Sequence, residues 1–146
     1  MKKTSTDLEK TLRDICFKIK IEGRKVLKRF DISSAQFDLL QLLYFKGEKK
    51  LSDISKVLGV TKSTTTGLIK RLLNQDLIEK KQSDEDKRVF HAKISKKGSG
   101  IIEEVIERRR VLIEKITQKM GKDKEFVEKL IELEKTLNEV VEGDEI

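Results

Sequence analysis

Apolar residues recur at steps of three and four along most of the chain, which predicts amphipathic helices. Long stripes run through residues 8–30, 101–120 and 126–141, and the last two are separated by Gly121, Lys122 and Asp123. Shorter stripes at 37–44, 51–58 and 68–73 predict three further helices. The chain is therefore expected to be mainly α-helical, with helices at both ends.

Two short helices in the middle of the chain are joined by a tight turn. Before them, Ser33 and Gln36 have the spacing of a capping box at the start of the helix at 37–44. Gly59 supplies a position for left-handed backbone after the stripe at 51–58, and Thr61 is placed to cap the following helix. Helix, short glycine-containing turn and helix make up the helix-turn-helix pattern.

The apolar period changes after residue 76. Residues 77–81 are expected to form a short strand, residues 82–87 a polar loop and residues 88–94 a second strand, in which Phe90, Ala92 and Ile94 alternate with polar or outward positions. A hairpin that follows a helix-turn-helix is a wing. The predicted fold is mainly α with a small β-hairpin wing: a winged helix-turn-helix flanked by N- and C-terminal helices.

Composition excludes several functional classes. The longest unbroken apolar run, residues 42–45, is far too short to span a membrane, and no secretory h-region is visible at the N-terminus. The chain has one cysteine and one histidine, so it cannot form an intrachain disulfide and offers little for a metal site or for nucleophilic catalysis. We expect a cytoplasmic protein that is not an enzyme and needs no cofactor or metal.

The charge is unevenly distributed. Residues 1–100 carry 24 basic and 13 acidic groups, whereas residues 101–146 carry 9 basic and 13 acidic groups. A basic body favours a polyanionic partner such as nucleic acid. The alternative explanation of this positive charge is a lysine-rich surface that contacts only solvent.

The start of the predicted second helix of the helix-turn-helix has an unusual composition. Five of the seven residues from 61 to 67 carry hydroxyl groups and another is glycine, which is costly inside a helix. Short donors and acceptors at a helix start suit close approach to phosphates and base edges in a DNA major groove. With Thr65 on the buried side, the candidates for base edges are Ser63, Thr64, Thr66 and Lys70, and those for phosphates are Lys62 and Arg71. A capping-rich helix start without a ligand is the alternative.

The predicted hairpin adds cationic residues. Lys87 and Arg88 fall at its turn, and an arginine at a wing tip can enter the electronegative minor groove. Asp86 is placed to hold the Arg88 guanidinium by a charge-assisted hydrogen bond. Alternatively, the two residues form a surface salt bridge of little energetic consequence.

These segments resemble the MarR family of winged-helix transcriptional regulators. Asp86, Arg88, Ala92, Ile94, Ser95 and Gly98 match the family's wing signature in type and spacing. Residues 51–54 and 59–64 resemble its helix-turn-helix, and residues 33–37 resemble the opening of its second helix. The similarity extends over nearly the whole chain. Gly67 departs from the pattern, because a larger residue is usual there.

The resemblance implies a homodimeric regulator, usually a repressor, on a pseudo-palindromic DNA operator. One domain would span residues 1–146, with the DNA-binding part at 33–95 and dimerisation helices at 1–30 and 96–146. The helix at 62–74 would read the major groove and Arg88 would probe the minor groove. Many members release DNA when a small aromatic or anionic effector binds between the DNA-binding and dimerisation parts.

Two other functions stay open. Ile15-Cys16-Phe17 resembles the cysteine motif of the peroxide-sensing branch of the family, which makes Cys16 a candidate redox thiol. Two observations count against this function. In the peroxide-sensing branch tyrosines usually form hydrogen bonds with the thiol, and this chain has a single tyrosine, Tyr44. A free cysteine is also often a small, buried apolar residue. A winged helix can also serve as a protein-interaction module, but the basic residues of the predicted second helix and wing argue against that use.

Overall fold

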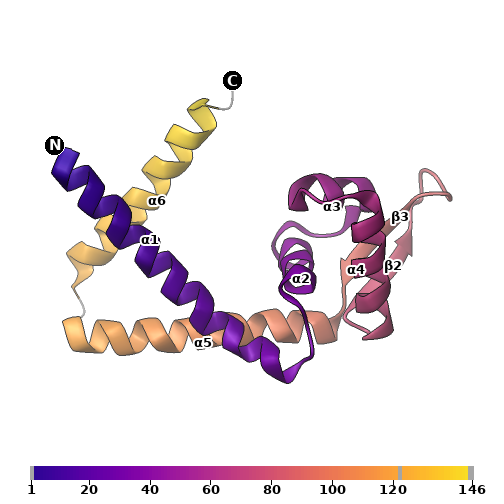
Figure 1. Ribbon diagram of the computed structural model, residues 1–146, viewed down its shortest axis with the longest axis horizontal. Coiled ribbons are helices and arrows are strands. Elements are labelled where there is room, and N and C mark those ends of the chain that lie inside the picture. The colour runs from indigo at the N-terminus through magenta and orange to yellow at the C-terminus, as the bar shows by residue number, and fades with distance from the viewer. Residues whose placement is uncertain (1, 122, 145–146) are drawn as a thin grey trace. The chain divides into compact units, whose positions relative to one another are not determined.

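The computed structural model describes residues 2–121 and 123–144, which form seven α- or 3-10 helices and three strands (Figure 1). The elements in chain order are α1 (Lys2–Arg24), η1 (Lys25–Arg29), α2 (Ser34–Lys46), β1 (Lys49–Lys50), α3 (Leu51–Leu58), α4 (Lys62–Asn74), β2 (Ile78–Gln82), β3 (Phe90–Ile94), α5 (Lys96–Met120) and α6 (Lys124–Asp144). The predicted fold class is confirmed. Residues 25–30, which the sequence pattern joined to the first helical stripe, lie outside α1 in the 3-10 helix η1 and the turn after it.

The chain divides into two compact units, residues 1–110 and 111–146, and the division falls within α5. The first unit contains the hydrophobic core. Its fully buried side chains come from α2, α3, α4, the residue before β2 and the first half of α5. The large apolar ones are Phe37, Leu39, Leu40, Leu43, Ile54, Leu72, Leu77, Ile102 and Val105. This core fixes α3, α4 and the sheet relative to one another.

The predicted cap of α2 is present in full. The Ser33 hydroxyl accepts a hydrogen bond from the Gln36 amide at 3.1 Å, and the Gln36 side chain accepts one from the Ser33 amide at 3.0 Å. These two bonds satisfy amides that the first turn of a helix leaves without partners. The Gln36 side chain also donates to Gln75 at 2.7 Å, which ties the start of α2 to the end of α4.

The wing forms as predicted, but it belongs to a sheet of three antiparallel strands in the order β1-β3-β2. In the long ladder Ile78 pairs with Ile94 and Gln82 with Phe90. The third strand, β1, contributes only Lys49 and Lys50, which pair with Ala92 and His91. The strand β1 is not predicted from the sequence, because two residues are too few to show an alternating pattern.

Gly98, the last residue of the wing signature, is required by close packing at the start of α5. A Cβ atom at this position would lie 2.2 Å from the Leu77 carbonyl oxygen. The amide of Gly98 donates to the Ser95 hydroxyl at 3.0 Å, and that hydroxyl donates to the Asp76 carbonyl at 2.7 Å. Together these contacts join the beginning of α5 to the segment between α4 and β2.

Several apolar side chains that the helical stripes assigned to buried faces are exposed in the single chain. Val57, expected on the inner face of α3, is 63% exposed. On α1, Leu8 and Ile15 of the predicted stripe are exposed, and so are Phe17 and Ile21, which lie outside that stripe. In the second unit, every described residue of α6 through Gly143 is exposed, and its large apolar side chains are Phe126, Val127, Leu130, Ile131, Leu133, Leu137, Val140 and Val141. Within the second unit the apolar stripe of α6 is therefore exposed.

Candidate nucleic-acid interface

The turn between α3 and α4 is built by one glycine and one threonine. Gly59 follows α3 with φ 65° and ψ 33°, the left-handed conformation that side chains other than glycine disfavour. Thr61 then caps α4, because its hydroxyl accepts a hydrogen bond from the Thr64 amide at 3.1 Å. Both residues have the local roles that the sequence predicted, and α4 begins at Lys62.

The hydroxyl-bearing residues at the start of α4 divide between an inner and an outer face. Thr65 is fully buried, and its hydroxyl lies 2.7 Å from the Ser55 hydroxyl of α3. Lys62, Ser63, Thr64 and Thr66 are exposed, as are Lys70 and Arg71 further along the helix. The predicted orientation of α4, with Thr65 inward, is thus confirmed.

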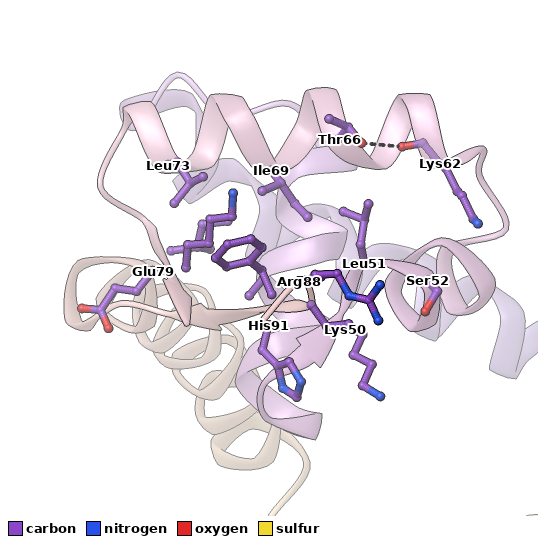
Figure 2. A pocket seen from close by; sticks show the side chains of 15 residues that line it. Lys50, Leu51, Ser52, Lys62, Thr66, Ile69, Leu73, Glu79, Arg88 and His91 are labelled. Atoms are coloured by element: carbon purple, nitrogen blue, oxygen red, sulfur yellow. Dashed lines mark hydrogen bonds between the residues drawn. The ribbon is translucent and has the colours of Figure 1, made fainter. Parts of the chain in front are cut away.

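The exposed hydroxyls differ in how much of their hydrogen-bonding capacity is in use. Thr66 donates to the Lys62 carbonyl at 2.8 Å (Figure 2), and Thr64 accepts from Thr61 at 3.0 Å. The Ser63 hydroxyl has no partner among the residues that the structure describes. Ser63, Gly67 and Lys70 follow each other at steps of four and three, so they lie on one outward stripe of α4.

Four of the cations predicted to contact DNA lack a carboxylate partner within residues 2–121 and 123–144. They are Lys62, Lys70 and Arg71 on α4 and Lys87 in the wing loop, and all four are exposed. An exposed cation without an internal partner is available to neutralise a phosphate and to release its counterions. The surface therefore has the charge that a DNA backbone requires.

The wing loop holds Arg88 in a fixed position. Its Nε and Nη2 atoms donate to the two carboxylate oxygens of Asp86, each at 3.2 Å, and its amide donates to the same carboxylate at 3.0 Å. These hydrogen bonds from Arg88 lower the pKa of Asp86 below its usual value, so the carboxylate stays ionised at neutral pH. The Arg88 side chain is still 90% exposed, which leaves it accessible to a ligand.

Further hydrogen bonds order the rest of the loop. The Ser83 amide donates to the Val89 carbonyl at 2.9 Å, and the Gln82 side chain donates to the Lys87 carbonyl at 2.7 Å. The Val89 amide donates to the Asp86 carbonyl at 2.9 Å. Arg88 and Val89 precede β3, which begins at Phe90, two residues later than the sequence pattern indicated.

A hollow of about 580 Å³ separates α4 from the wing (Figure 2). Ile69 and Leu73 point into it from α4, and the Arg88 guanidinium lies near Leu51 and Ser52 at its other end. Lys62, Thr66 and Arg88, three predicted site residues, border this hollow. Lys50, Lys80 and Phe90 also border the hollow, although the sequence does not predict them as site residues.

Cys16, the candidate redox residue, is exposed on α1 in the single chain and lies outside this surface. That position differs from the buried one that a small apolar cysteine would take. Among the described residues, no group of histidine, cysteine and carboxylate side chains could hold a metal ion. No helix of the described chain has the length and apolar character to cross a membrane.

Comparisons with known proteins define the family. The MarR family model matches residues 32–90. An HTH-type transcriptional regulator of Bacillus subtilis, YsmB, is 38% identical over 104 residues, which are 71% of each chain.

Solved structures extend the similarity over nearly the whole chain. The transcriptional regulator Tm0710 from Thermotoga maritima is 45% identical, with a TM-score of 0.81 over 95% of this chain and 96% of its own. A MarR family protein from Bacillus stearothermophilus is 31% identical, with a TM-score of 0.79 over 97% of this chain and 98% of its own. The chain belongs to the MarR family and is a DNA-binding transcriptional regulator with a winged helix-turn-helix, not an enzyme.

Proposed function

We propose that this protein is a cytoplasmic, homodimeric repressor that binds a pseudo-palindromic DNA operator and is released by a small aromatic or anionic effector. The main evidence for DNA binding is the surface formed by α4 and the wing. It combines the exposed hydroxyls of α4 with four cations that have no described internal partner and with Arg88, which Asp86 orients.

Each part of this surface has a proposed role. Ser63, Thr64, Thr66 and Lys70 contact base edges in the major groove, where hydroxyl and ammonium groups can read donor and acceptor patterns. Lys62, Arg71 and Lys87 neutralise phosphates, and Arg88 enters the minor groove with Asp86 as its support. Gly67 contributes no side chain, so any contact at this point of α4 involves its backbone.

The exposed apolar stripes support the homodimer. Soluble monomers rarely expose large contiguous apolar surfaces, and here such residues line α1, the second half of α5 and most of α6. We assign residues 1–30 and 96–146 to dimerisation and residues 33–95 to DNA binding. Two copies would place two α4 helices on half-sites about one duplex turn apart.

Two more distantly similar proteins of the same fold bind the two kinds of ligand that we propose, DNA and a small aromatic compound. The MepR protein of S. aureus, 22% identical, has been solved as a complex with DNA, and NadR, 21% identical, as a complex with 4-hydroxyphenylacetate. In those proteins the fold accommodates a duplex in one case and a small aromatic acid in the other.

Selection of binding sites from a random duplex pool tests the proposed function. We expect an enriched sequence with two inverted half-sites whose centres lie about 10 base pairs apart. Arg88→Ala should weaken binding strongly without unfolding the protein, and Thr66→Ala should change the enriched sequence more than it changes non-specific affinity. A pool that shows no enrichment, together with saturable binding of a protein partner, would favour an interaction module instead.

A further inference from the structure

Gln75 is the C-cap residue of α4, and both ends of its side-chain amide are hydrogen-bonded. Its oxygen accepts from the Gln36 side chain of α2 at 2.7 Å, and its nitrogen donates to the Asp31 carbonyl at 3.1 Å. Gln36 is buried and Gln75 is half-buried. Because a buried amide that loses its partner is costly, these bonds keep the Gln75 side chain in one position.

Both segments that we assign to dimerisation lie next to Gln75. Asp31 directly follows the first segment, residues 1–30, and Lys97 belongs to the second, residues 96–146. The Lys97 ammonium donates to the Gln75 backbone carbonyl at 3.2 Å, at the C-terminal end of a helix, where a cation is favoured. Gln75 is therefore hydrogen-bonded both to the residue that ends the first segment and to the first turn of the second.

The backbone beside these bonds is left-handed at two places. Asp31 has φ 51° and Asp76 has φ 60°, and they are the only residues other than glycine with positive φ in the described chain. After α4 the Asp76 amide donates to the Leu73 carbonyl and the Leu77 amide to the Leu72 carbonyl, both at 3.0 Å, a pattern that usually has glycine at the position of Asp76. A less favourable conformation at both places indicates that the surrounding contacts fix it.

We propose that Gln75 is a positioning residue that sets the orientation of residues 33–95 on the dimerisation helices, and with it the spacing of the two half-sites. Ser63 precedes Gln75 by twelve residues, which is about 18 Å along the helix axis. A rotation of about 5° at Gln75 would therefore move the Ser63 end by about 1.5 Å. That displacement exceeds the roughly 0.5 Å within which binding groups must be held.

The affected property is the spacing, not the sequence of each half-site. The Ser55–Thr65 contact and the buried Leu68 and Leu72 hold α4 inside the DNA-binding part without Gln75. The cations proposed to contact phosphates are also unchanged, so non-specific affinity should stay the same. This inference rests on the proposed DNA-binding function and deepens it, because it names what sets the distance between the two copies of α4.

Binding to duplexes of altered spacing tests the proposal. One added or removed base pair moves the second half-site by about 3.4 Å and rotates it by about 35°. We expect the parent protein to lose about tenfold in affinity for such duplexes, and Gln75→Met to lose about threefold or less, with weaker binding at the preferred spacing. Asn74→Leu is the matched control, because it removes the amide of the neighbouring, exposed residue and should behave like the parent.

A second variant separates the two side-chain bonds. Gln75→Glu keeps an acceptor for Gln36 but has no donor for the Asp31 carbonyl, so it should behave like Gln75→Met. If Gln75→Glu, or a folded Gln75→Met, keeps the spacing discrimination of the parent, the proposal is overturned. Equal weakening on every duplex, non-specific ones included, would show a general structural defect and would also overturn it.

A measurement without DNA distinguishes this inference from the proposed function. Nitroxide labels on Ser63→Cys, in a Cys16→Ser background, report the distance between the two copies of α4 by pulsed EPR. In Gln75→Met the distribution should shift or broaden by about 3 Å, because each copy moves by about 1.5 Å. An unchanged distribution would overturn the positioning role. If the distribution changes but the parent protein binds no duplex, the positioning role stands and the DNA-binding function fails.

Discussion

The Ser55 hydroxyl of α3 lies 2.7 Å from the Thr65 hydroxyl of α4 inside the protein core. Ser55 also lies 3.1 Å from the Leu51 carbonyl oxygen, and Thr65 lies 2.9 Å from the Thr61 carbonyl oxygen. Because each hydroxyl has one proton, the pair can make two of these three hydrogen bonds at a time. The contact is a polar link between the two helices of the helix-turn-helix, and it sets α4 against α3.

This link predicts coupled stability effects. Thr65→Val and Ser55→Ala should each lower the free energy of unfolding by about 1 kcal/mol, because each change removes one side of a buried hydrogen bond. The double variant should lose less than the sum by about 0.5 kcal/mol or more. Urea unfolding of the four proteins measures the coupling, and strictly additive losses would show that the two hydroxyls do not stabilise each other.

Two glycines in helices should respond to alanine in opposite directions. A Cβ atom at Gly67 would meet no atom within 4 Å, so Gly67→Ala should stabilise the protein by about 1 kcal/mol through helix propensity. At Gly98 the Cβ would collide with the Leu77 carbonyl oxygen, and Gly98→Ala should cost about 1–3 kcal/mol.

Denaturant unfolding of the two alanine variants and the parent measures this difference. If Gly67→Ala lowered the stability, the added Cβ atom would have to meet another group, which would contradict the open space beside Gly67. A neutral Gly98→Ala would mean that the start of α5 does not pack against Leu77 as described.

The Asp86–Arg88 pair should be visible in a pH titration. Because hydrogen bonds from Arg88 lower the pKa of Asp86, the ion pair is intact at neutral pH and is lost as the pH falls through that lowered value. An NMR titration of the Asp86 carboxyl should give a midpoint below the ordinary aspartate value of about 3.9. In Arg88→Gln the midpoint should return toward that value, and identical midpoints in the two proteins would show that Arg88 is not held by Asp86.

The apolar stripe of α6 should be needed for self-association. Leu137 and Val140 are 56% and 57% exposed in the single chain, and a glutamate at either position would place a charge in the proposed interface. Sedimentation equilibrium should show a dimer for the parent and a shift toward monomer for Leu137→Glu and Val140→Glu. Asn138→Glu adds the same charge at a neighbouring position and is the control. A parent protein that is monomeric at micromolar concentration would contradict the homodimer.

Local sequence signals predicted the parts of the fold that depend on local interactions. The Ser33–Gln36 capping box, Gly59, the Thr61 cap and the buried Thr65 are all found where the pattern placed them. These features follow from hydrogen bonds and backbone preferences within a few residues, which a single sequence displays directly.

Features that depend on contacts between residues far apart in the sequence are harder to predict from the sequence alone. The strand β1 exists because Lys49 and Lys50 pair with β3, more than 40 residues away, and nothing in the two lysines indicates this. Phe90 borders the hollow because of where α4 lies relative to the sheet, so the alternating pattern of β3 alone does not distinguish it from a core residue. Amphipathic stripes likewise identify the apolar faces of α1 and α6 without specifying which surface covers them.

The salt dependence of duplex binding tests the central claim, that α4 and the wing form the DNA-binding surface. On a logarithmic plot of association constant against salt, Lys62→Gln should reduce the magnitude of the slope by about 0.9, because one phosphate contact is lost. The control Lys135→Gln, on α6, should leave the slope unchanged. A slope for Lys62→Gln equal to that of the parent, with both proteins folded, would contradict the account.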